Sequence, residues 1–314
     1  MSKPRLLCIT GHTASGKSGL AMELARRLPA ELLSVDSMQV YRGFDIGTAK
    51  PTAAERAAVV HHGLGLCDPH ERYSAGAFLE YARELLEQER ERPIIAVGGT
   101  GLYLRAMLHG LGPEAPADRA LRRELRAAEE AAPGTLHARL AEVDPEAAAR
   151  LHPNDLIRVE RALEVYELTG STISRWHAEH DTTSPFQPLL IGLRRERGEL
   201  RARIGARVDA MLAAGWVDEV RGLLAAGVPE DATPMVAIGY RDIAAHLRGE
   251  LDAQALRDRI ERACWRFAKR QTTWFNHEPG VHWLDPQEGL AERLAGAVGP
   301  WLSGAADTPP LEAL

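Results

Sequence analysis

Residues 5–18 read Arg-Leu-Leu-Cys-Ile-Thr-Gly-His-Thr-Ala-Ser-Gly-Lys-Ser, and this stretch decides the fold. Its first half is a short apolar run typical of a buried strand, and a helical stretch from Gly16 to about Leu28 follows it. The second half, residues 11–18, fits the pattern G-x-x-x-x-G-K-S. Because the pattern stands between a predicted strand and a predicted helix, the context that it requires, it predicts a loop that binds a diphosphate or triphosphate.

The chemistry of this loop follows from its residue types. Glycine lets the backbone curl so that its N–H groups face an anion, and the helix dipole begins at the same place. Lys17 adds a positive charge, and the hydroxyl of Ser18 is suited to hold Mg²⁺. The loop therefore predicts a phosphate site, but it does not by itself say which reaction takes place there.

Working outward, strands are predicted at residues 31–35, 93–97, 189–193 and 281–284, with an amphipathic helix at 75–91. This alternation predicts an α/β fold, a P-loop NTPase-like parallel sheet flanked by helices. The first three strands end at Gly11, at Asp36 and just before Thr100. Since ligands bind at the carboxyl ends of parallel strands, these residues are expected to meet in one crevice. There Asp36 would hold magnesium through water or act as a general base.

Four regions are expected along the chain. Residues 1–112 form the first part of the α/β core. Residues 113–182 have helical patterning without a convincing strand, which predicts an inserted all-helical module. Residues 183–302 complete the core with basic C-terminal helices. The tail at 303–314 is small and proline-bearing, and it is expected to be disordered.

The composition is that of a folded, soluble protein. The 314 residues are 45% hydrophobic and 26% charged, without a signal peptide or a transmembrane run. Three scattered cysteines favour reduced thiols in the cytoplasm over disulfides or a zinc site. No membrane partner is expected, and the default assembly is a monomer. A net charge of −6 argues weakly against nucleic acid, but arginine-rich stretches at 191–207 and 257–275 would suit a phosphate backbone.

Five further blocks carry a resemblance to one enzyme family. They are DSMQVYRGFDIGTAKP at 36–51, GGTGLY at 98–103, RALEVYELTG at 161–170, AIGY at 237–240 and AKRQTTWF at 268–275. In this order, and at about this spacing, the set resembles the tRNA dimethylallyltransferases (isopentenyl-diphosphate:tRNA transferases). The likeness covers roughly residues 5–285. No Cys/His zinc-finger extension follows, so the sequence is most similar to the compact bacterial type.

The resemblance implies a Mg²⁺-dependent transfer of a dimethylallyl group from dimethylallyl diphosphate to N6 of the adenosine 3′-adjacent to the anticodon of tRNA. It implies Asp36 and Thr100 as catalytic residues and Ser18 as a metal ligand. The residues implied to bind the diphosphate are Gly11, Thr13, Ala14, Ser15, Gly16, Lys17 and Ser18. Those implied to contact tRNA are Asp36, Ser37, Met38, Gln39, Arg158 and Arg161. Lys269, Arg270 and Gln271 are expected to form a further patch that contacts phosphates or bases of the tRNA.

Three other functions fit parts of the pattern. A small-molecule kinase would use the loop for ATP and Asp36 as a base toward a hydroxyl. A prenyltransferase acting on free adenine nucleotides would share the loop but would not need the helical insert. A nucleotide-gated RNA-binding module would bind tRNA without forming a product. Departures from the family pattern at Ile157, Cys264-Trp265 and Asn276 weaken individual RNA contacts that the resemblance implies.

Overall fold

The computed structural model describes residues 3–88, 90–111, 117–179 and 184–311. Six strands form one sheet in the order β3-β2-β4-β1-β5-β6, and every neighbouring pair is parallel. The strands are β1 (Arg5–Gly11), β2 (Glu31–Val35), β3 (His61–His62), β4 (Ile94–Gly98), β5 (Gln187–Leu193) and β6 (Val281–Leu284). The predicted α/β fold is confirmed, although the short edge strand β3 was not predicted.

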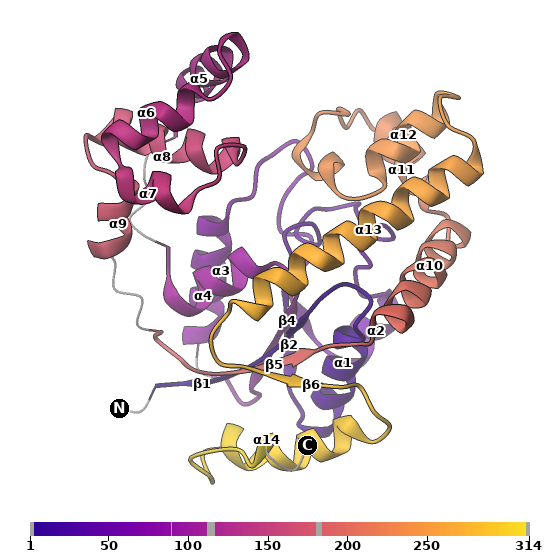
Figure 1. Ribbon diagram of the computed structural model, residues 1–314. Coiled ribbons are helices and arrows are strands. Elements are labelled where there is room, and N and C mark those ends of the chain that lie inside the picture. Colours follow the sequence, from indigo (N-terminus) through magenta and orange to yellow (C-terminus); the bar gives the residue numbers. More distant parts are fainter. Residues whose placement is uncertain (1–2, 89, 112–116, 180–183, 312–314) are drawn as a thin grey trace. The chain divides into compact units, whose positions relative to one another are not determined.

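Helices connect these strands and cover the sheet (Figure 1). They are α1 (Lys17–Arg27), α2 (Ala53–Ala58), α3 (Ala75–Glu87), α4 (Gly101–His109), α10 (Arg197–Ala213), α11 (Trp216–Ala225), α12 (Tyr240–Leu247), α13 (Ala253–Asn276) and α14 (Leu290–Leu302), with the 3₁₀ turn η1 (Thr233–Val236). Helices α10 and α11 are separated by a glycine turn. Gly215 has a φ of 96°, a left-handed conformation that ends α10 and starts α11.

Two apolar layers hold this part of the chain together. Side chains alternate along each strand, so Leu7 and Ile9 of β1 lie on one face of the sheet while Leu6 and Cys8 lie on the other. The first face packs against α1 and α14, and the second packs against α3, α4 and the helices α10 to α13. Burial on both faces explains the continuous apolar runs by which the strands are recognised in the sequence.

The chain divides into two compact units, Met1–Leu108 with Ser184–Leu314, and His109–Thr183. The second unit encloses the region expected as a helical insert at 113–182. Its helices are α5 (Arg119–Ala131), α6 (Thr135–Val143), α7 (Pro145–Arg150), α8 (Leu156–Thr169) and α9 (Ile173–Glu179). Its own core includes Leu125, Leu136, Leu140, Val159 and Leu163, and its described residues contain no strand.

The tail at 303–314, for which disorder is expected, is described as far as Leu311 and contacts the start of β1. The guanidinium of Arg5, at the start of β1, donates hydrogen bonds to the carbonyl oxygens of Trp301 and Ala306, the second at 2.7 Å. Leu311 packs against the same apolar layer as α14. Residues 312–314 lie outside the described residues. Within the described ranges, no helix combines the length and apolar character needed to span a bilayer.

Candidate functional site

The predicted phosphate loop joins β1 to α1 in an unusual backbone conformation. Gly11, Ala14 and Gly16 all have positive φ angles, of 133°, 62° and 101°. A Cβ on Gly11 would lie 2.7 Å from the carbonyl oxygen of Leu193, so only glycine fits there. Such a turn directs successive N–H groups to one side, which makes it a cradle for an anion.

Two arginines of the β5–α10 region fix this loop from behind. Arg195 Nε donates to the carbonyl oxygen of Ser15 at 2.8 Å, and Arg203 Nε donates to that of Ala14 at 2.9 Å. These two hydrogen bonds hold the carbonyl oxygens of Ala14 and Ser15 toward the arginines. The Ser15 hydroxyl is buried and has no hydrogen-bond partner among the described residues.

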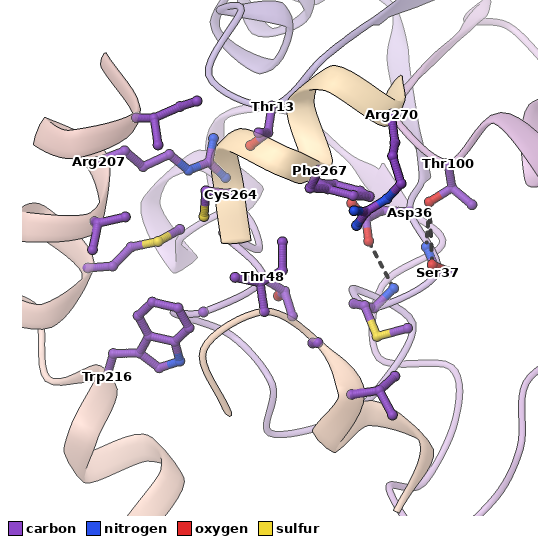
Figure 2. A pocket seen from close by; sticks show the side chains of 18 residues that line it. Thr13, Asp36, Ser37, Thr48, Thr100, Arg207, Trp216, Cys264, Phe267 and Arg270 are labelled. Atoms are coloured by element: carbon purple, nitrogen blue, oxygen red, sulfur yellow. Dashed lines mark hydrogen bonds between the residues drawn. The ribbon is translucent and has the colours of Figure 1, made fainter. Parts of the chain in front are cut away.

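Asp36, directly after β2, has one carboxylate oxygen bound and one available. Its Oδ1 accepts hydrogen bonds from the N–H groups of Met38 at 2.8 Å and Gln39 at 3.3 Å. No hydrogen bond within the described chain involves Oδ2. Figure 2 shows the carboxylate at the wall of a cavity, close to Ser37 and Thr100. The carboxylate is thus oriented by its own turn and presents an oxygen that can accept a proton.

Thr100, after β4, lies beside Asp36 as the topology predicts. Its Oγ1 accepts a hydrogen bond from the Ser37 N–H at 3.0 Å and lies 3.4 Å from the Ser37 hydroxyl (Figure 2). The Thr100 N–H in turn donates to the carbonyl oxygen of Val35 at 3.3 Å. The ends of β2 and β4 are therefore joined through this threonine, which holds its hydroxyl at the cavity wall.

Gln271 of α13 lies inside the site, although an RNA contact was expected for it from the sequence. Its Oε1 accepts a hydrogen bond from the Thr13 N–H at 2.7 Å, and its Nε2 donates to the Gly99 carbonyl at 2.9 Å. Only 6% of the residue is exposed. A Cβ on Gly99 would approach Gln271 Nε2 to 2.3 Å, which explains the glycine. Gln271 thus ties the phosphate loop to the loop that carries Thr100.

Gln39 also has an internal role. Its Oε1 accepts from the Ser34 hydroxyl at 2.8 Å, and its Nε2 donates to the carbonyl oxygens of Thr48 and Ala49 at 3.0 and 3.1 Å. With these bonds the amide supports the loop that runs from Asp36 to Ala49. Ser37 and Met38, implied as RNA contacts beside it, line the cavity.

Two half-buried cations interact with Asp36. Desolvation, together with the positive charge of Arg207, lowers the pKa of Lys17 to about 8, and the negative charge of Asp36 opposes this shift. Burial likewise lowers the pKa of Arg207, while Cys264 and Asp36 raise it. Arg207 was not predicted as a site residue, because it lies within an arginine-rich stretch that was interpreted as an RNA-binding surface. The helical periodicity of the sequence could have indicated it, since Arg207 lies on the same side of α10 as the buried Ile204 and Val208.

These groups meet at a cavity of about 250 Å³ with two chemically different ends. Thr13, Asp36, Thr100, Arg207 and Arg270 make one part of its wall polar. The rest is apolar and is formed mainly by Ile204, Val208, Met211, Trp216, Ile238, Cys264 and Phe267 (Figure 2). A neighbouring cavity of about 120 Å³ shares the Thr13, Asp36 and Arg207 walls and adds Lys17 and Ser18.

The oxygen ligands available for a metal are few. Among the described residues there is no cluster of three or more His, Cys, Asp or Glu side chains arranged to hold an ion. The Ser18 hydroxyl and the Asp36 carboxylate do line the same small cavity. This sparse oxygen set fits Mg²⁺, which keeps several waters and is held by one or two protein oxygens together with substrate phosphates.

The arginines implied to bind RNA in the helical unit differ in availability. The Arg158 side chain is 63% exposed and pairs with Asp155 at 3.0 Å. Arg161 pairs with Glu164, whose side chain is fully buried and also binds Arg122 at 2.7 Å. Arg161 therefore belongs to an internal ion-pair network, whereas Arg158 is at the surface. Ile157, the residue before Arg158 and one of the departures from the family pattern, is 79% exposed.

Lys269 and Arg270 leave α13 in different directions. Arg270 lines the 250 Å³ cavity, and its guanidinium lies 5.6 Å from the centre of the Phe267 ring. Lys269 lines a separate groove on the other side of the helix. Of the two, only Arg270 is placed to contact a group inside the cavity.

Comparison with known proteins assigns this geometry to one family. A family model described as IPP transferase matches residues 39–278. The "tRNA dimethylallyltransferase 1" of Trichlorobacter lovleyi is 48% identical over 294 residues, 92% of this chain and 96% of the relative. The "tRNA dimethylallyltransferase" of Symbiobacterium thermophilum is 49% identical over 284 residues, 89% of each chain.

Solved structures agree with these sequence relatives. The tRNA isopentenylpyrophosphate transferase of Bacillus halodurans has a TM-score of 0.70 at 38% identity, covering 96% of this chain and 97% of that one. A eukaryotic dimethylallyltransferase solved acting on tRNA has a TM-score of 0.82 at 27% identity, covering 96% of this chain and 80% of that one. The likeness therefore extends over nearly the whole chain.

Proposed function

Because this chain belongs to the IPP transferase family, we propose that it transfers a dimethylallyl group from dimethylallyl diphosphate to N6 of the adenosine 3′-adjacent to the anticodon (position 37) in tRNA, releasing diphosphate. One observation carries the proposal. An oriented carboxylate, a hydroxyl and a phosphate-type loop meet at a cavity whose remaining wall is apolar. The phosphate-type loop suits a charged leaving group, the apolar wall suits a prenyl chain, and the carboxylate suits a weakly nucleophilic amine that must lose a proton.

The diphosphate lies in the loop at residues 11–18. Its N–H groups and the ammonium of Lys17 stabilise the negative charge that grows on the diphosphate as the bond from its oxygen to prenyl C1 breaks. Thr100 supports the same oxygens with its hydroxyl. Mg²⁺, held by Ser18 and by Asp36 through water, supplies further positive charge to the leaving group when bound. Gln271 acts as a positioning residue, because it holds Thr13 against the loop that carries Thr100.

Asp36 completes the reaction by accepting a proton. As the bond between N6 and prenyl C1 forms, the amine must lose one proton, and Asp36 Oδ2 has no competing hydrogen bond within the described residues. General-base assistance of this kind is worth roughly 10²- to 10⁴-fold in rate. The dimethylallyl group itself contains no polar atom, and the wall formed by Val208, Met211 and Trp216 suits it.

The acceptor is a base splayed out of a single-stranded loop. An adenine inside a duplex cannot reach a cavity of this kind, whereas an anticodon-loop base can be flipped into it. Ser37, Met38 and Arg270 line the cavity wall that would meet the base. Arg158 and Lys269 offer exposed positive charge for the RNA backbone. The enzyme acts as a monomer in the cytoplasm, where its three free cysteines remain reduced.

The alternative functions have less support. A kinase acting on a small alcohol would not explain the apolar wall, since a hydroxyl acceptor needs polar surroundings. Prenyl transfer to free adenine nucleotides would share the cavity, but the relatives and solved structures described above are named for transfer to tRNA.

The experiment is a transfer assay with radiolabelled dimethylallyl diphosphate, Mg²⁺ and an unmodified anticodon stem-loop RNA, run beside AMP and ATP as acceptors. We expect label on the loop adenosine alone. Label on AMP or ATP would replace tRNA by free nucleotides as the acceptor. Prenyl transfer would be refuted if no acceptor were labelled and dimethylallyl diphosphate failed to bind. The loop would then be expected to bind a nucleotide, as in a kinase or a nucleotide-gated RNA-binding module.

A further inference from the structure

A groove separate from the reaction cavity lies on the opposite face of α13. Cys264 and Phe267 point from this helix into the reaction cavity, whereas Trp265, Lys269 and Asn276 line the groove. Residues 265, 269 and 276 follow the helical repeat on one face, and 264 and 267 fall on the far side. The groove encloses about 610 Å³, between α13, the β5–α10 connection and β6.

The groove wall is strongly basic. Its lining includes Arg194, Arg195, Arg197 and Lys269, and it contains no Asp or Glu. Arg194 pairs with Asp285 at 3.0 Å, and Arg195 pairs with Glu199, so two of the four charges are balanced from outside the lining. Arg197 and Lys269 have no ion pair with any described residue. Two uncompensated cations facing one hollow favour an anionic ligand.

Trp265 lies close to both of these cations. The Arg197 guanidinium is 5.8 Å from the centre of its indole ring, and the Lys269 ammonium is 5.5 Å from it. Trp265 is only half-buried. The other groove tryptophan, Trp283, packs over Gly192, where a Cβ would approach its ring to 2.7 Å. Trp265 is therefore the aromatic surface that remains available for stacking.

We propose that this groove binds a nucleotide unit, with the base stacked on Trp265 and the phosphate held by Arg197 and Lys269. Aromatic and basic side chains in one groove are the combination that binds single-stranded nucleic acid. The expected source is an unpaired nucleotide of the RNA substrate, and in this respect the inference rests on the proposed function. A free nucleotide offers the same phosphate and base, so the experiment separates the two sources.

The groove also reaches the phosphate loop. His12 of that loop lines it, and Arg195 connects the groove wall to the Ser15 carbonyl at 2.8 Å. A nucleotide bound here would lie across α13 from the reacting adenosine, on the outer side of the loop that holds the diphosphate. The groove therefore adjoins the phosphate loop, but it is distinct from the cavity in which transfer takes place.

The test measures binding of a fluorescein-labelled anticodon stem-loop by anisotropy at several salt concentrations, so it does not depend on transfer. Trp265→Leu should weaken binding roughly 5- to 150-fold with little change in salt dependence, the range expected when one base stack is removed. Trp265→Phe should restore most of the affinity. The double variant Arg197→Gln/Lys269→Gln should reduce the slope of log K against log salt by about 0.7 for each phosphate that the groove no longer neutralises.

The control is Arg83→Gln/Arg201→Gln, which removes two exposed charges outside the groove. A slope change in the control as large as that in Arg197→Gln/Lys269→Gln would overturn the inference, because overall charge alone would then explain it. Binding of AMP is measured in parallel with the phosphate loop saturated by diphosphate. Weaker AMP binding in Trp265→Leu with unchanged RNA affinity would assign the groove to a free nucleotide. Unchanged RNA and AMP binding in Trp265→Leu would refute the site, whereas failure of the wild-type transfer assay would refute the proposed function.

Discussion

Removal of the Gln271 side-chain amide tests whether the site depends on the hydrogen bonds by which Gln271 connects the phosphate loop to the loop that carries Thr100. In Gln271→Leu the side chain keeps a similar size but loses both hydrogen bonds, from the Thr13 N–H and to the Gly99 carbonyl. In Gln271→Glu an oxygen remains to accept from Thr13, but the donor to Gly99 is lost. The pair of variants therefore separates the two halves of the tie.

The magnitude follows from burial. Gly99 is buried, so its carbonyl would be left unpaired at a cost of about 1–3 kcal/mol. Thr13 lines both cavities, where water can take over its hydrogen bond, and its loss should add less than about 1 kcal/mol. We therefore expect Gln271→Leu to lower the free energy of unfolding by about 1–4 kcal/mol. Because the phosphate loop can then shift relative to Thr100, the transfer rate should fall by roughly 10²-fold, as for other misplacements of about 1 Å.

The assays are urea unfolding, with the change taken from the midpoint at constant slope, and single-turnover transfer to the stem-loop RNA. Gln254→Leu on the same helix is the matched control. The residue is exposed, and among the described residues its amide binds only Asp258, so its effect should stay within about 0.5 kcal/mol. If Gln271→Leu unfolded at the wild-type midpoint and transferred at the wild-type rate, the tie would have no energetic or positioning role, and our reasoning would be wrong.

Three further predictions test the charged groups. Asp36→Asn keeps an oxygen for its turn but cannot accept the N6 proton, so single-turnover transfer should fall roughly 10²- to 10⁴-fold with stem-loop affinity retained, and wild-type-like turnover would exclude the base role. Burial lowers the pKa of Lys17 to about 8, so the diphosphate affinity measured by calorimetry should weaken as the pH rises through 8, and a flat affinity profile would contradict this. In the unfolded chain this lysine has a higher pKa and stays protonated above pH 8. The free energy of unfolding should therefore rise with pH above 8. Glu164→Gln removes the buried partner of Arg122 and should destabilise the helical unit by about 3 kcal/mol, seen as faster amide exchange in α5 and α8 with dimethylallyl diphosphate affinity unchanged.

The parts of the fold that could be predicted from the sequence are those encoded locally. The strand, loop and helix at residues 5–28 follow from an apolar run, glycines and a lysine that are adjacent in the chain. The placement of Asp36 beside Thr100 required only the rule that parallel strands end at one edge. The same reasoning did not find β3, because His61 and His62 carry no apolar pattern and pair only as a short edge.

What sequence reasoning could not reach depends on tertiary contacts. Gln271 is 258 positions from Thr13, and its motif context indicated RNA rather than the phosphate loop. Arg207 was included in a basic stripe, although burial and Asp36 give it a role in the cavity. The composition of the C-terminal tail gave no sign of its contact with Arg5, at the opposite end of the chain. In each case the deciding partner lies far away in sequence.

The contact between Arg5 and the C-terminal tail has a practical consequence for handling the protein. It holds Ala306 beside Arg5 at the N-terminal edge of β1, whereas the reaction cavity lies at the other edge of the sheet. β1 has seven residues, so the two edges are separated by about 20 Å. Fusion partners or surface anchors attached at either end would therefore leave the cavity open, but a tag that displaces residues 303–311 would expose the apolar layer under α14 and favour aggregation.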